Sequence, residues 1–109
     1  MDYNNDFFNC DIRTGTILGA TAFPEARKPA YQLTIDFGAL GIKKSSAQIT
    51  DLYDASILIG MQIVAVVSLP PKRIAGFVSE CLVLGAVQQD GSVVLLQTER
   101  KVTNGIRIS

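Results

Sequence analysis

The sequence contains no histidine, and this absence narrows the chemistry open to the protein. Histidine is the commonest general base and metal ligand, so Ser–His and Cys–His nucleophile pairs are excluded. The only cysteines, Cys10 and Cys81, are far apart in the sequence and without histidine argue against a zinc site. Lys44 and Ser45 are neighbours on a predicted strand, so they point to opposite faces and form no Ser–Lys pair. We therefore predict no catalytic residues, metal or cofactor, and no enzyme.

Net charge is also absent, because ten lysines and arginines balance ten aspartates and glutamates. The distribution is uneven, since eight of the ten basic residues form adjacent pairs: Arg27-Lys28, Lys43-Lys44, Lys72-Arg73 and Arg100-Lys101. A neutral protein can still carry a positive patch that binds phosphate. The simpler interpretation of any one pair is a solvated loop tip.

Long hydrophobic runs are missing, and the longest apolar stretches are too short to cross a bilayer. Residues 1–12 lack the basic and apolar regions of an export signal. Two cysteines without such a signal are typical of free thiols in a reducing compartment. We expect a cytoplasmic protein with no membrane insertion, in which residues 1–109 form one domain.

Most of the recognisable segments in the sequence have the residue pattern of β-strands. The apolar runs Met61–Leu69 and Glu80–Ala86 predict strands buried on both sides, with Cys81 packed as a small hydrophobe. The connector between them opens with Pro70-Pro71, which predicts a rigid loop presenting Lys72, Arg73 and Phe77. Alternating apolar and polar residues over 30–37 predict a strand with one wet face.

The order of the remaining segments indicates the fold. Asp11–Thr21 reads as a strand in which Gly15 and Gly19 mark a bulge or bend, and Ile42–Ile49 as an unusually polar third strand. Thr50–Ile59 predicts a short helix capped by Thr50 or Asp51. Such a helix between strands three and four is typical of a mainly all-β, five-stranded OB-fold barrel, here with N- and C-terminal extensions. A small β-sandwich is the alternative.

Two binding functions fit the polar strand and the proline loop. Lys43, Lys44, Ser45, Gln48, Lys72 and Arg73 are suited to phosphate and ribose or base edges, and Phe77 to stacking on a base. The apolar residues around the Pro-Pro loop equally suit an extended peptide. The structural alternative is that Phe77 caps the core and the lysines keep an edge soluble.

Several stretches closely resemble the CsaA group of secretion chaperone-like proteins, in the tRNA-binding-domain family. They include Asp11–Gly15 (DIRTG), Phe23–Gly38 (FPEARKPAYQLTIDFG), Gly41–Thr50 (GIKKSSAQIT), Pro70-Pro71 and Ile74–Gly85 (IAGFVSECLVLG). The likeness covers nearly the whole chain. The resemblance implies an OB-fold module related to those fused to some aminoacyl-tRNA synthetases, where they bind tRNA.

The resemblance also implies an export-related chaperone that binds unfolded preproteins or peptides as a homodimer, with tRNA binding as the alternative. By position it implies a ligand groove near Lys43, Lys44, Ser45, Gln48, Lys72, Arg73, Phe77 and Ser79. Glu80-Cys81 stands where wider relatives tend to carry Gly-Met, and an acidic residue there counts against strong tRNA affinity. Apolar residues near the termini, Phe7, Phe8, Ile106 and Ile108, are expected to cover sheet edges in a dimer.

Overall fold

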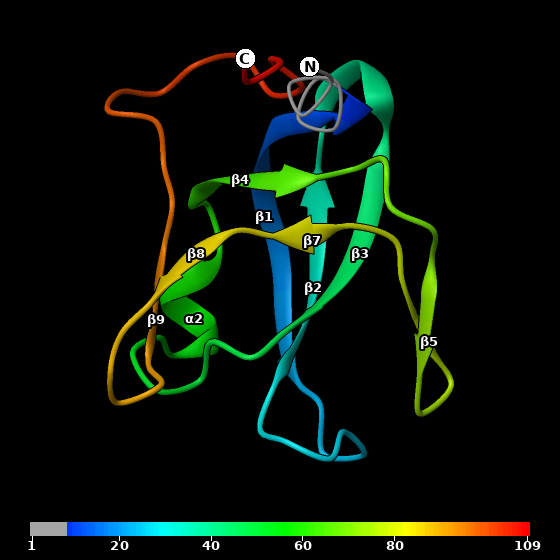
Figure 1. The fold of residues 1–109 in the computed structure, drawn as a ribbon, viewed down its shortest axis with the longest axis vertical. Coiled ribbons are helices and arrows are strands. Elements are labelled where there is room, and N and C mark those ends of the chain that lie inside the picture. Colours follow the sequence, from blue (N-terminus) through cyan, green and yellow to red (C-terminus); the bar gives the residue numbers. More distant parts are fainter. Residues whose placement is uncertain (1–8) are drawn as a thin grey trace, which may run out of the picture.

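A curved five-stranded sheet forms the body of the computed structural model, which describes residues 9–109 (Figure 1). Its order is β3–β2–β1–β4–β7, and every neighbouring pair is antiparallel. The strands are β1 (Ile12–Ala22), β2 (Tyr31–Asp36), β3 (Ile42–Ala47), β4 (Gln62–Val66) and β7 (Leu82–Val83). The ends of the sheet meet where the Glu80 amide donates to the Lys44 carbonyl, 2.7 Å away. The predicted OB-type barrel is therefore confirmed.

The first strand, β1, is long enough to pair with strands on both sides of the barrel. Its first half pairs with β4 and its second half with β2, and the register shifts between Ile17 and Gly19. This irregularity, expected from the glycines, lets the strand bend around the core. The largest fully buried apolar side chains inside the barrel are Phe37, Ile17, Leu33, Ile35, Leu58 and Ile63.

The predicted rigid loop after Pro70-Pro71 is a two-stranded hairpin. Its strands are β5 (Lys72–Ile74) and β6 (Phe77–Ser79), joined by a tight turn at Ala75 and Gly76. Both turn residues have positive φ, 47° and 85°, as a type I′ turn requires. The loop prediction was wrong because the polar residues Lys72 and Arg73, which follow the prolines, hid a short pairing register.

The predicted helix shrinks to α2 (Ala55–Leu58), and neither Thr50 nor Asp51 caps it. Tyr53 explains the difference, because the barrel holds both its ends. Its carbonyl accepts from the Tyr31 hydroxyl (2.7 Å), and its own hydroxyl accepts from the Leu95 amide (3.0 Å). The first half of the predicted helix is therefore fixed as irregular chain.

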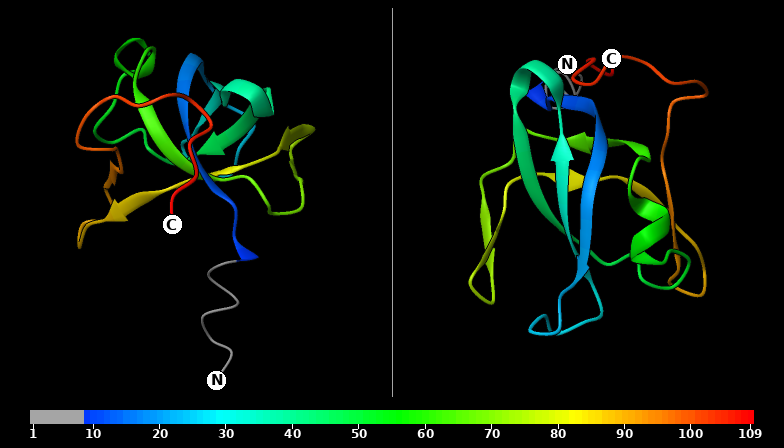
Figure 2. Two further views of the ribbon diagram at one scale, coloured as in Figure 1. Left: turned by 90° about the horizontal axis from the view of Figure 1, so that it is seen from above. Right: turned by 180° about the vertical axis from the view of Figure 1, so that it is seen from behind.

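The predicted fifth strand is interrupted. After β7 the chain leaves the barrel as β8 (Gly85–Val87), which pairs with β9 (Val93–Leu95) across the expected turn at Asp90-Gly91. This hairpin and the β5–β6 hairpin extend from opposite sides of the barrel (Figure 2). No helix within residues 9–109 is long and apolar enough to cross a membrane.

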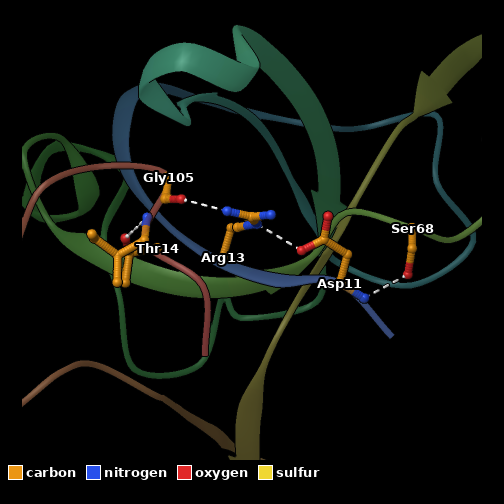
Figure 3. A network of polar contacts seen from close by, with 6 residues as sticks. Asp11, Arg13, Thr14, Ser68 and Gly105 are labelled. Atoms are coloured by element: carbon orange, nitrogen blue, oxygen red, sulfur yellow. Dashed lines mark hydrogen bonds and ion pairs between the residues drawn. The ribbon is translucent and has the colours of Figure 1, made fainter. Parts of the chain in front are cut away.

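The C-terminal segment returns to β1 and is held there by polar contacts (Figure 3). The Arg13 guanidinium bridges the Asp11 carboxylate (2.6 Å) and the Gly105 carbonyl (3.0 Å). Ile108 packs on a second apolar cluster of this same chain, on the outer face of β4, and its role on a partner subunit stays a prediction. Ile106 remains exposed. Phe7 and Phe8 lie outside the described residues.

Candidate ligand-binding groove

Side chains hold most of the seam between β3 and residues 79–81. Three donors cross it: the Lys44 amide to Glu80 Oε1 (3.0 Å), the Ser46 amide to Ser79 Oγ (3.1 Å) and the Ser45 hydroxyl to the Cys81 carbonyl (2.9 Å). A regular ladder would use backbone groups alone and would place no demand on residue type. The seam thus explains why a serine stands at position 45 and why an acidic residue stands at position 80.

The placement of Ser45 in a ligand groove needs correction. Ser45 is 0% exposed, and it points into the barrel with Ala47 because alternate strand residues share a face. Its hydroxyl is already committed to the Cys81 carbonyl. Ser45 is therefore a structural residue of the seam.

Replacing Ser45 with alanine should destabilise the protein by about 1–2 kcal/mol, because the Cys81 carbonyl loses its shorter hydrogen bond in a buried site. Thermal unfolding should then begin roughly 5–10 °C lower. The matched control is Ser46→Ala, whose hydroxyl bonds no other described residue and whose loss should cost less than about 0.5 kcal/mol. Equal effects of the two substitutions would contradict this role for Ser45.

Cys81 packs as the small hydrophobic residue that the sequence predicts. Cys81 is buried in the main core cluster, and its Sγ lies 3.7 Å from the Lys44 carbonyl. Burial raises the pKa of Cys81 to about 11, against the opposing effects of the Ser45 hydrogen bond and the Lys43 charge. The thiol is therefore protonated near neutral pH, which leaves it a poor nucleophile.

A basic cavity of about 680 Å³ lies between the β1–β2 loop and the β5–β6 hairpin. Figure 1 shows the cyan loop and the hairpin extending toward the same end of the molecule. The rings of Phe23, at the start of the loop, and Phe77, in the hairpin, are 5.4 Å apart and tilted by 58°. This contact ties the two walls together. The cavity is lined by Arg27, Lys28, Lys72 and Arg73, with Ser46, Gln48, Ile74, Ala26 and Ala30.

An apolar cavity of about 460 Å³ adjoins it between β3 and the β7–β8 segment. Four residues line both cavities: Ser46, Gln48, Lys72 and Ile74. Its other walls are mainly apolar, including Leu82, Val83, Leu84, Val87 and Val93. None of the residues lining either cavity is acidic. We call these two adjoining cavities the groove.

The structure gathers only some of the predicted site residues at the groove. Gln48, Lys72 and Arg73 line the basic cavity, and Gln48, Lys72 and Ser79 line the apolar one. Lys44 and Phe77 instead border a separate hollow of about 380 Å³ beside Glu80. Lys43 has the same strand parity as Ser45 and lines neither cavity.

Sequence reasoning left Arg27, Lys28 and Ser46 out of the site. The signal was present, because Arg27 and Lys28 form one of the basic pairs and their loop is bounded by prolines. Only the folded barrel brings this loop beside the β5–β6 hairpin, which lies more than forty residues away in the sequence. Within residues 9–109, no cluster of three or more acidic or cysteine side chains is arranged to hold a metal ion.

The comparisons with known proteins agree with this fold. The family model described as "Putative tRNA binding domain" matches residues 12–107. A crystal structure of chaperone CsaA from Bacillus anthracis is 57% identical, with a TM-score of 0.94, and covers 100% of this chain and 99% of that one. A CsaA chaperone protein from Picrophilus torridus is 50% identical, with a TM-score of 0.92 and complete coverage of both chains.

The chain also resembles segments of larger proteins and a more distant structure of similar length. Methionine–tRNA ligase from Bacteroides fragilis is 34% identical over 104 residues, which are 95% of this chain and 15% of the ligase. The chain thus spans about 15% of the length of these curated relatives. A MetRS related protein from Pyrococcus horikoshii is 25% identical, with a TM-score of 0.87 over 100% of this chain and 98% of that one. The chain therefore belongs to the tRNA-binding domain family and within it is of the CsaA type.

Proposed function

We propose that the protein is a molecular chaperone that binds extended segments of unfolded polypeptide in the groove, in the service of protein export. The observation that carries this proposal is that the apolar cavity adjoins the basic cavity and shares four lining residues with it. An extended chain needs apolar pockets for some side chains and polar surroundings for its backbone. The chaperone titles of the similar structures support the same function.

We also propose a catalytic status, a cellular location, an oligomeric state and a domain organisation for the protein. The groove contains no nucleophile activated by a base among its lining residues, so we propose a binding protein and no enzyme. The two free thiols support a reducing, cytoplasmic location. Exposed apolar residues outside the groove, Val94 and Ile106, support a homodimer. Residues 1–109 are proposed to form a single domain.

Leu82→Asn tests peptide binding at the apolar cavity. Leu82 lines this cavity and is 48% exposed, so its replacement removes apolar surface with little cost to the core. We expect affinity for an unfolded polypeptide to fall about tenfold, as measured by fluorescence anisotropy with a labelled, reduced substrate protein.

The matched control is Leu96→Asn. Leu96 is exposed to a similar degree, 43%, but lines neither cavity of the groove. Its replacement should leave the affinity unchanged. Wild-type affinity in both variants, or no binding of unfolded polypeptide by the unmodified protein, would refute the proposal.

A specific observation also favours tRNA binding as a second candidate. Four cations and no acidic residue line the basic cavity, and cations are the groups that neutralise nucleic-acid phosphates. The family match and the methionine–tRNA ligase relatives support this alternative. The two ligands differ in how their binding responds to salt, because only tRNA binding releases counterions from phosphates.

A further inference from the structure

The barrel seam is incomplete, and the groove occupies its open part. Hydrogen bonds join β3 to residues 79–81 only as far as Ser46. Beyond that point, no hydrogen bond among the described residues links positions 46–49 to β7 or β8. β3 and β7 are also the two ends of the sheet order, so each presents one free edge here. The apolar cavity is lined from both edges, by Ser46 to Ile49 and by Leu82 to Gly85.

We propose that the groove binds its peptide as an added strand on the chain edge at Gln48, just beyond the Ser46 amide that Ser79 already holds, and that it selects segments in which acidic residues adjoin apolar ones. The inference rests on the proposed peptide-binding function and names its substrate class. A free strand edge offers backbone donors and acceptors to an extended chain, while pockets beside it choose the side chains.

Charge sets the preferred sequence. The basic cavity brings together Arg27 and Lys28 from one loop and Lys72 and Arg73 from the hairpin, and no acidic residue lines it. Cations held close together repel one another, and a carboxylate placed among them relieves this repulsion. A cationic peptide segment would increase the repulsion among these cations. The basic cavity therefore favours aspartate or glutamate over lysine or arginine.

The shared walls place the acidic and apolar residues next to each other. Lys72 and Ile74 alternate along β5 and line both cavities, as do Ser46 and Gln48 on the β3 side. A strand lying along this wall passes directly from the basic cavity into the apolar one. Its successive side chains point to opposite sides, so alternate apolar residues enter the cavity.

Synthetic peptides of about nine residues, roughly 30 Å when extended, test both parts of the inference. One peptide carries an Asp-Asp pair followed by alternating valine and threonine, and two others replace the pair with Asn-Asn or Lys-Lys. We expect the Asp-Asp peptide to bind about tenfold more tightly than the Asn-Asn peptide, and the Lys-Lys peptide to bind most weakly. Arg27→Gln with Lys28→Gln should reduce the Asp-Asp preference to about twofold.

The control pair is Arg100→Gln with Lys101→Gln, which removes the same charges outside the groove and should keep the full preference. For the strand edge, the Asp-Asp peptide is N-methylated at alternate amides in two complementary sets. One set should abolish binding and the other should be tolerated, because only alternate amides face the β3 edge.

The possible outcomes distinguish a failure of this inference from a failure of the proposed peptide-binding function. Equal affinity for the Asp-Asp and Asn-Asn peptides would overturn the acidic preference, and equal effects of the two methylated sets would overturn strand addition. Either result leaves the peptide-binding function standing. Failure of all three peptides and of an unfolded protein to bind would refute that function itself.

Discussion

Replacing Gly105 with alanine should lower the melting temperature by about 15 °C, through a loss of about 3 kcal/mol of stability. Gly105 has φ of +86°, and a Cβ there would lie 2.5 Å from the Phe37 carbonyl oxygen. The atoms that this Cβ would meet all belong to the backbone of Phe37 and Ala39, so they cannot move aside without shifting the chain. The substitution should therefore detach the C-terminal segment from β1 and the turn after Phe37. Differential scanning calorimetry measures the change.

Gly91→Ala is the control for the left-handed conformation alone. Gly91 has φ of +90°, but no atom lies within 4 Å of a Cβ built at this position. Its replacement should cost only about 1 kcal/mol, the strain of a non-glycine residue at positive φ. If Gly105→Ala were no worse than Gly91→Ala, the close approach of the C-terminal segment to the barrel would be wrong.

Binding of tRNA, if the groove provides it, should weaken by about 100-fold between roughly 50 and 200 mM salt. The estimate takes the four cations of the basic cavity as the groups that displace counterions from phosphates. An uncharged apolar peptide should change by less than about twofold, because its binding releases no counterions. Fluorescence anisotropy with labelled tRNA and labelled peptide measures both affinities in the same buffers.

Variants that lack particular cations show which surface of the protein binds the tRNA. Lys72→Gln with Arg73→Gln should lower the slope of log affinity against log salt by about two. The Arg100→Gln and Lys101→Gln pair, outside the groove, should leave the slope unchanged. A slope lowered equally by both pairs would place tRNA elsewhere, and no binding at low salt would exclude the tRNA candidate.

The sequence predicted the barrel strands well because their signals are local. Alternation over Tyr31–Asp36 and the apolar run around Gln62–Val66 each fix a strand and its buried faces, and the structure agrees. β4 is buried along its whole length, with the main core on one face and the Ile108 cluster on the other. The expected bulge near Gly19 is also present, because a glycine inside a strand signals its irregularity directly.

The failures share a different cause, which is long-range pairing. Tyr53 is held by Tyr31 and Leu95 from distant strands, so local helix signals over Thr50–Ile59 lost to tertiary contacts. Ser45 was assigned to a ligand because polar residues on a strand usually face water. Its partner, the Cys81 carbonyl, is thirty-six residues away and is invisible to periodicity.

By itself, the sequence determined the all-β class, the succession of strands along the chain, the small helix between strands three and four, and the presence of paired cations on loops. These depend on residue type and spacing within a few residues. The tertiary structure alone decided which cations share a cavity, which strand residues point inward, and where the seam stays open. Those features arise when segments such as Arg27-Lys28 and Lys72-Arg73 are brought together by barrel closure, and no local pattern encodes that distance.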